Sequence, residues 1–198
     1  MQQSERTAQR TRTTRETDIQ LSINLDGSGQ STINTGVGFL DHMLTLFCKH
    51  GQFNLDVHCN GDLHIDDHHT VEDIGIVLGQ AVAEALGDKA HINRYGHAYV
   101  PMDEVLARAV VDLSGRFYFH FNCTFTRPMV GQLATEMVPH FWYSFAEHAR
   151  CNLHLDVLHG ANSHHQIEGL FKAAARALRL AVRRDAENAV MPSTKGSL

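Results

Sequence analysis

The chain has 198 residues, of which 43% are hydrophobic and 20% charged, and its formal net charge is −5 with histidine neutral. A chain of this length and composition can bury a core, which excludes disordered and fibrous proteins. The negative charge argues against a general nucleic-acid binder, because affinity for a phosphate backbone needs clustered Lys and Arg. No apolar stretch approaches the roughly 18 residues that span a bilayer, so we expect no membrane partner.

The four cysteines, Cys48, Cys59, Cys123 and Cys151, lie far apart, form no C-x-x-C pair and follow no signal-peptide pattern. We therefore expect reduced thiols and a cytoplasmic protein. Residues 1–15 are rich in Arg and Thr, so an organelle transit peptide stays open as an alternative to a flexible or early-strand start.

The first half of the chain reads as strand, strand, helix, strand, helix. Apolar and polar side chains alternate over residues 16–26, which predicts a half-buried strand, and a second extended stretch follows the turn DGSG. The apolar spacing of residues 39–51 predicts a helix, and residues 52–59 form a short extended segment. Ala, Leu and Val at spacings of three and four, without proline, predict a long helix over residues 70–88.

The second half repeats this order. Glu16 and Glu104 each precede, by nine residues, a Leu that leads into a Gly turn. Residues 137–149 align without gaps on residues 39–51. The remaining segments of the second copy are extended stretches at 103–115, 115–125 and 150–158 and a long helix at 166–185.

This duplication predicts the fold. We expect an α+β protein with internally duplicated β-β-α-β-α halves, in which sheet on one side packs against a layer of helices with pseudo-twofold symmetry. The halves are residues 1–93 and 94–185, together one compact unit, and residues 186–198 are a C-terminal tail.

Each predicted long helix opens with the motif HH-x-x-E, at residues 68–72 and 164–168. Residues four apart share a helix face, so the first His and the Glu of each motif can chelate one ion. Adjacent side chains diverge by about 100° around the helix axis, so His69 and His165 should reach a second ion. One such motif alone is more typical of a solvated helix start. Two copies in register, each with an equivalent upstream histidine, favour a dinuclear metal centre.

We expect two four-ligand sites. One consists of His42, His68, Glu72 and His165, and the other of His140, His164, Glu168 and His69. Six imidazoles and two carboxylates without a thiolate suit Mn²⁺, Fe²⁺, Co²⁺ or Zn²⁺ rather than Ca²⁺, Mg²⁺ or an iron–sulfur cluster. Ligand type alone does not choose among these ions.

Several other polar residues are candidates with open alternatives. Lys172 lies four residues after Glu168, so it either points toward the ions or forms a plain surface ion pair. Glu16 and Glu104 occupy equivalent positions, and the sequence does not decide which, if either, does acid–base work. His50 and His148 also repeat in register and could line the site. Basic or hydroxyl residues outside the long helices that could clasp an anion are Arg94, Arg116, Arg127, Ser193, Thr194 and Lys195.

Six segments of the chain resemble one enzyme family. They are GVGFLDHML, GDLHIDDHHTVEDIGIVLGQA, PMDE, DLSGR, LHGANSHHQIEGLFKAAARAL and PSTKG. Together they closely resemble the imidazoleglycerol-phosphate dehydratases in their monofunctional form, from about Arg10 to Gly196. Trp142, where Phe is expected, and Gly169, where a small residue such as Ala is usual, depart from the family pattern without touching a proposed ligand.

The resemblance implies a hydro-lyase of histidine biosynthesis that converts D-erythro-imidazole-glycerol phosphate to imidazole-acetol phosphate. It implies two Mn²⁺ per active site, held by the eight ligands named above, with the substrate's imidazole between them. An imidazolate that bridges two cations can expel the C3 hydroxyl and form a diazafulvene intermediate, because the metals stabilise the ring charge.

The resemblance also assigns further roles. Glu16 becomes the expected acid–base residue, and His50 lies in the family's substrate-binding stretch. The residues expected to hold the substrate and its phosphate are Arg94, Arg116, Lys172, Ser193, Thr194 and Lys195. The family is similar in forming a homo-oligomeric shell of two dozen subunits, so we expect active sites at subunit interfaces.

Two other functions compete with this one. A dinuclear hydrolase would activate a metal-bound water, but such enzymes usually rely on Asp and Glu bridges. A metal-storage protein would have no use for Glu16, Lys172 and an anion clamp near its ions.

Overall fold

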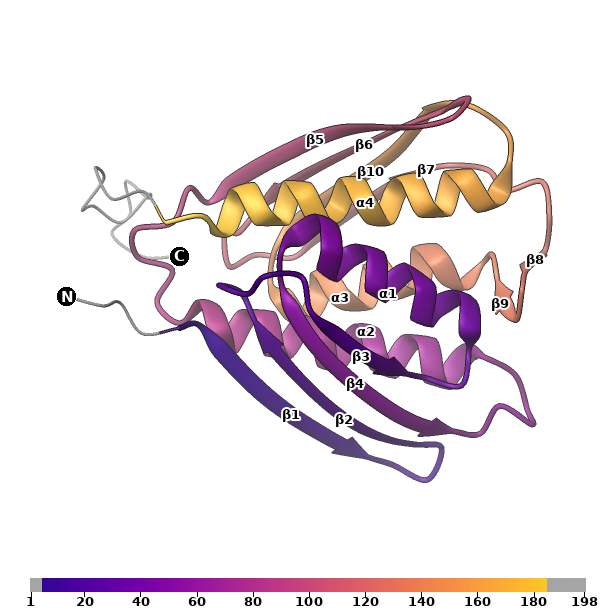
Figure 1. The fold of residues 1–198 in the computed structure, drawn as a ribbon, viewed down its shortest axis with the longest axis horizontal. Coiled ribbons are helices and arrows are strands. Elements are labelled where there is room, and N and C mark those ends of the chain that lie inside the picture. The colour runs from indigo at the N-terminus through magenta and orange to yellow at the C-terminus, as the bar shows by residue number, and fades with distance from the viewer. Residues whose placement is uncertain (1–4, 185–198) are drawn as a thin grey trace.

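Two four-stranded sheets form opposite faces of the molecule, and helices fill the space between them (Figure 1). The computed structural model describes residues 5–184. Residues 186–198, expected to be a tail, lie outside the described residues. None of the helices in residues 5–184 is long and apolar enough to cross a bilayer.

The two sheets share one topology. The strands of the first, in spatial order, are β1 (Thr7–Thr13), β2 (Thr17–Asn24), β4 (Asn54–Gly61) and β3 (Ser31–Asn34). Those of the second are β5 (Tyr95–Met102), β6 (Val105–Asp112), β10 (Asn152–His159) and β7 (Tyr118–Asn122). In each sheet the first three strands are antiparallel and the fourth is a parallel edge strand. A small hairpin pairs β8 (Met129–Val130) with β9 (Leu133–Ala134).

The helices cross between the halves. They are α1 (Gly38–Gly51), α2 (His68–Leu86), α3 (Met137–Ala149) and α4 (Ser163–Val182). Helix α2 packs against α3, and α1 packs against α4, so each of these two helix pairs joins one helix from each half. The α2–α3 approach is close because Gly75 and Gly79 face the helix: a Cβ there would lie 2.7 Å from the Phe141 carbonyl oxygen and 2.5 Å from that of Phe145.

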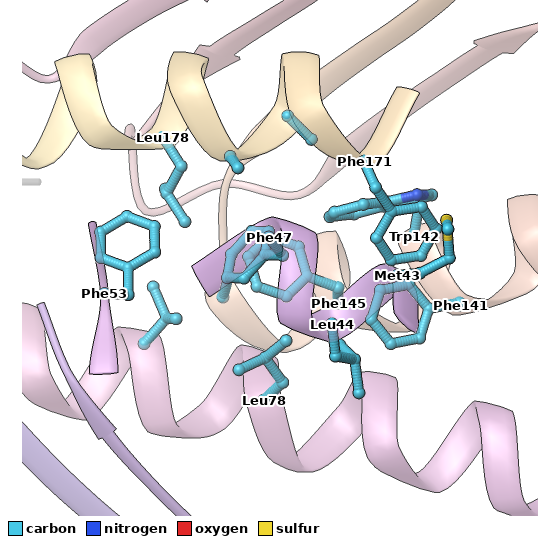
Figure 2. Packing of buried hydrophobic residues seen from close by; sticks show 14 of the residues in the cluster. Met43, Leu44, Phe47, Phe53, Leu78, Phe141, Trp142, Phe145, Phe171 and Leu178 are labelled. Atoms are coloured by element: carbon cyan, nitrogen blue, oxygen red, sulfur yellow. The ribbon is translucent and has the colours of Figure 1, made fainter. Parts of the chain in front are cut away.

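Aromatic side chains from several helices pack against one another within this helix layer (Figure 2). The Trp142 ring lies 4.7 Å from that of Phe171 and 6.2 Å from that of Phe47, centroid to centroid, so α3 contacts both α4 and α1. All three side chains are buried. Burial of rings from three helices in one cluster fixes how the helix N-termini sit relative to one another.

The expected α+β class and duplicated halves are confirmed. Each half carries an additional first strand: β1 lies within residues 1–15, where a flexible or early-strand start was expected, and β5 was not predicted from the sequence. Ala8 is the one buried side chain of β1, so the sequence of that strand shows no alternation of apolar and polar residues. The helices also lie between two sheets, rather than on one side of a single sheet.

Candidate active site

The tips of the β1–β2 and β5–β6 hairpins and the first turns of the helices lie at one end of the molecule, on the right of Figure 1. Within residues 5–184, this end holds two groups of three side chains that could hold a metal ion. In each group the ligand atoms lie within 4.8 Å of one another. The two groups are called triad A and triad B.

Triad A joins α1 to α4 and consists of His42, His164 and Glu168. The Glu168 carboxylate is buried, and its Oε2 atom lies 3.4 Å from Nε2 of His42 and 3.3 Å from Nε2 of His164. The ring of Phe39 packs edge-on against His164, with centroids 4.9 Å apart. Two imidazoles and one carboxylate therefore converge on one point.

Triad B joins α3 to α2 and consists of His140, His68 and Glu72. Nε2 of His140 lies 3.3 Å from Oε1 of Glu72, and Nε2 of His68 lies 3.7 Å from Oε2 of the same carboxylate. Because α3 belongs to the second half and α2 to the first, triad B is the pseudo-twofold counterpart of triad A.

The expected grouping of ligands is wrong in one respect. His42 was expected to join His68 and Glu72, and His140 to join the other motif. The His–Glu pairs form as predicted, but the third histidine comes from the opposite half, because α1 packs against α4 and α3 against α2. Whether these residues bind metal stays a prediction.

The chemistry of triad B fits a metal ion. Nε2 of His140 is buried and, within residues 5–184, makes no hydrogen bond, although Oε1 of Glu72 lies 3.3 Å away. A buried polar atom without a partner costs free energy that a bound cation would recover. The donor set of nitrogen and carboxylate oxygen suits Mn²⁺, Fe²⁺, Co²⁺ or Zn²⁺.

His69 and His165 do not join either triad of their own chain. Nδ1 of His69 lies 3.0 Å from Oδ2 of Asp62, and Nδ1 of His165 lies 2.9 Å from Oε2 of Glu104. These carboxylates raise the pKa of each imidazole, and the bond to His165 lowers the pKa of Glu104. A carboxylate at Nδ1 fixes the ring orientation and leaves Nε2 as the ligand atom.

A second carboxylate faces Nε2 of each of these histidines. Oε1 of Glu16 lies 3.8 Å from Nε2 of His69, and Oδ2 of Asp103 lies 3.7 Å from Nε2 of His165. Sequence reasoning missed Asp62 and Asp103. The signals available were an acidic residue seven before His69 and the neighbour of Glu104 in PMDE.

Lys172 contacts triad A directly. Its Nζ atom donates a hydrogen bond of 2.5 Å to Oε1 of Glu168. Burial raises the pKa of the Glu168 carboxyl, but Lys172, His42 and His164 together outweigh it and hold that pKa below its usual value. The Lys172–Glu168 ion pair is therefore largely buried rather than a plain surface pair, and the approach of Lys172 to bound ions stays a prediction.

A basic cavity continues from Lys172 along α4. It has a volume of about 880 Å³, and its lining within residues 5–184 includes Lys49, His50, Arg176, Arg179 and Arg183 and no carboxylate. Burial, followed by the charges of Lys172 and Arg176, lowers the pKa of His50. The cavity can therefore accept an anion one helical turn beyond Lys172.

Arg94 and Arg116 lie at the opposite end of the second sheet. Arg94 forms an ion pair with Asp112, 2.7 Å from Nε to Oδ1, and the Arg116 carbonyl accepts a hydrogen bond from Asn152. Asn152 begins β10, which runs eight residues, about 25 Å, toward the α4 N-terminus. One chain therefore does not bring these arginines to its own triads. Ser193, Thr194 and Lys195 lie outside the described residues.

Comparisons with known proteins agree on one family. The model of the imidazoleglycerol-phosphate dehydratase family matches residues 35–178. A relative of that name from Salinibacter ruber is 65% identical over 98% of this chain and 96% of its own, and one from Cellvibrio japonicus is 55% identical over 98% and 100%. The crystal structure of the Staphylococcus aureus dehydratase has a TM-score of 0.83 and 46% identity, covering 90% of this chain and 99% of that one. A Pyrococcus furiosus structure of the same name has a TM-score of 0.82 and 34% identity, covering 96% and 100%.

Proposed function

Since the chain belongs to the imidazoleglycerol-phosphate dehydratase family, hydro-lyases of histidine biosynthesis, we propose that it dehydrates D-erythro-imidazole-glycerol phosphate with the help of two bound Mn²⁺ ions. The observation that carries the metal dependence is the pair of His–His–Glu triads. Triad A and triad B would each hold one ion. Bound cations of this kind stabilise negative charge that develops on the substrate's imidazole ring.

Glu16 performs the proton transfers in this proposal. Its side chain is about half exposed at a hairpin tip, and its carboxylate lies beside the Nε2 face of His69. The Glu16 carboxyl donates a proton to the C3 hydroxyl, which leaves as water, and the resulting carboxylate accepts the proton from C2 of the glycerol chain. It then returns that proton to C3, while the enol hydroxyl releases its own proton to solvent and becomes the ketone. The diazafulvene route implied by the family resemblance stays a prediction.

The phosphate end of the substrate is held by basic side chains. Lys172 lies one helical turn from Glu168, and the basic cavity with His50 begins beyond it. A lysine ammonium and nearby arginines suit a dianionic phosphate. Ser193, Thr194 and Lys195 of the chain's last residues are proposed to complete this clamp.

Arg94 and Arg116 support a proposal of shared active sites. Because they lie far from the triads of their own chain, they would serve the site of a neighbouring copy. His69 and His165 would likewise place Nε2 on a neighbour's triad as a fourth ligand. We propose a cytoplasmic homo-oligomer, a shell of 24 subunits, with the active sites at subunit interfaces.

The outer face of the second sheet favours contact between copies. Tyr95, Tyr99 and Tyr118 are 57%, 56% and 53% exposed there. The outward positions of β2 in the first sheet are all polar instead: Asp18, Gln20, Ser22 and Asn24. Exposed aromatic side chains are typical of interaction surfaces.

Turnover of imidazoleglycerol phosphate by metal-stripped protein tests the proposal. We expect no activity before Mn²⁺ is added, full activity afterwards, and loss of activity in both Glu72→Gln and Glu168→Gln. Glu84→Gln is the matched control, because Glu84 lies on α2 outside both triads and pairs with Arg10. Uptake of Mn²⁺ without turnover would contradict the proposed reaction.

A further inference from the structure

A four-residue turn holds Glu16 at the tip of the β1–β2 hairpin. The Thr14 amide donates to the Thr17 carbonyl at 2.8 Å, which closes the turn. The Thr14 hydroxyl oxygen accepts hydrogen bonds from the amides of Glu16 and Thr17, both at 3.0 Å. The backbone of Glu16 is thus tied to Thr17 through one side-chain oxygen.

Thr17 in turn is tied to helix α2. Its hydroxyl donates a hydrogen bond of 2.5 Å to Oδ2 of Asp73, and both side chains are buried. Nε of Arg12 lies 2.9 Å from Oδ1 of the same carboxylate, so the buried charge has a partner. Hydrogen bonds to a buried carboxylate are short and strong, so this contact fixes the hairpin tip on the helix.

The contact sits beside the site. Asp73 follows Glu72 of triad B in the same helical turn, and Thr17 follows Glu16. The Glu16 carbonyl also accepts a hydrogen bond of 3.0 Å from the amide of Asp62, whose carboxylate orients His69. Two contacts therefore set the position of Glu16 relative to triad B and His69: the Thr17–Asp73 hydrogen bond and the Asp62–Glu16 backbone hydrogen bond.

The second half lacks this anchor. Gly169 follows Glu168 at the place equivalent to Asp73, and a Cβ there would lie 3.2 Å from Cβ of Ala107 and 3.5 Å from Cγ1 of Val105. No carboxylate can tie the β5–β6 tip to α4 at this point. Glu104 instead bonds His165 with its own side chain.

We propose that Asp73, acting through the hydroxyl of Thr17, is a positioning residue that holds the Glu16 carboxylate over the reacting carbons. This rests on the proposed acid–base role of Glu16. The hydroxyl is the connecting group, so serine at position 17 preserves the connection and valine, which has nearly the same shape, removes it. Asp73→Asn weakens the same link by removing the charge.

The test compares Thr17→Val with Thr17→Ser in steady-state kinetics of the Mn²⁺-loaded full chain. Thr17→Val should lower kcat by about 10- to 100-fold, because small misplacements of a catalytic group carry costs of this order. KM should stay within about twofold, and Thr17→Ser should restore most of kcat. The bound Mn²⁺ should be unchanged in both variants. Equal kcat in the valine and serine variants would overturn the proposal.

A double-mutant cycle with Glu16→Gln shows whether Thr17 acts through Glu16. If it does, Thr17→Val has no further effect on kcat in the Glu16→Gln background. Additive losses would overturn the positioning role. A Glu16→Gln variant with normal kcat would instead refute the acid–base role itself, so the two failures are distinguishable.

Asp26→Asn is the structural control. Asp26 forms an ion pair with Arg6, 2.6 Å from Oδ1 to Nη2, beyond the opposite end of β2 from Thr17. Its loss should lower stability without changing kcat. A fall in kcat equal to that of Thr17→Val would mean that any weakening of the hairpin has this effect, which would overturn the specific role of Thr17 and Asp73.

Discussion

The hairpins β1–β2 and β5–β6 turn at equivalent places, yet their glutamates make different contacts. Glu104 bonds Nδ1 of His165 and the amide of Asn162. Among residues 5–184, the Glu16 carboxylate makes neither kind of bond and faces Nε2 of His69 instead. One glutamate orients a histidine, and the other fits the acid–base role proposed for it.

The cause lies in the loops before the two long helices. Residues 62–67 precede α2 and supply Asp62, which takes Nδ1 of His69. Residues 160–162 precede α4 and contain no carboxylate, so the hairpin supplies it through Glu104. The duplication has kept a carboxylate at Nδ1 of each histidine without keeping its position in the sequence.

The largest expected effect separates Glu16 from Glu104. Glu16→Gln should lower kcat by about 10²- to 10⁴-fold, because it removes the proposed acid–base group. Glu104→Gln should cost far less, because an amide oxygen can still accept the hydrogen bond from His165. Steady-state kinetics on both variants measures this difference, and equal losses would remove the distinction between the tips.

The next effect is on stability and concerns the position after each motif glutamate. Gly169→Asp should lower the free energy of unfolding by about 3–5 kcal/mol, because the new carboxylate would be buried without a partner. Gly169→Ala should change it by no more than about 1 kcal/mol, since alanine's helix propensity offsets its tight contacts. Urea unfolding monitors both. An aspartate tolerated at 169 would contradict the asymmetry.

A third effect tests the shared role of Asp62 and Glu104. Asp62→Ala and Glu104→Ala should each weaken Mn²⁺ binding by about 10- to 100-fold, as expected for groups that orient a ligand histidine. Equilibrium dialysis with Mn²⁺ measures the affinity. An effect confined to one variant would mean that the two carboxylates are not counterparts.

The smallest expected effect concerns Asp26, which lies beyond the end of β2 opposite Thr17. The side-chain hydrogen bond from Arg6, opposed by burial, holds the pKa of Asp26 below its usual value. The pair therefore stabilises the fold above the unfolded-state pKa of this carboxyl, and that contribution is lost as the pH falls through the lower folded-state pKa. Asp26→Asn should cost about 1–2 kcal/mol at neutral pH and flatten the acid dependence of unfolding. An unchanged acid profile would contradict this assignment.

Local features of the structure were predictable from the sequence, because their signals are periodic. The helices expected at 39–51 and 70–88 are observed at Gly38–Gly51 and His68–Leu86, since apolar side chains recur every three or four residues. The i, i+4 pairs of the two motifs are likewise local, and they form as expected.

Features that depend on tertiary packing were not predictable. His42 meets Glu168 because α1 packs on the other half's α4, and no pattern near either residue encodes that choice. Strand β1 pairs along one edge and exposes most of its side chains, so burial leaves little trace in its sequence. Asp62 lies in an irregular loop, where its contact with His69 follows from the loop's path.

Each proposed metal site joins residues of the two halves. The most direct measurement counts Mn²⁺ per chain after equilibrium dialysis of a Glu168→Gln variant and of two double variants built on it. We predict that Glu168→Gln retains one ion, that adding His42→Ala leaves this count at one, and that adding His140→Ala brings it to zero. Loss of the remaining ion on adding His42→Ala, with the ion retained on adding His140→Ala, would contradict the account.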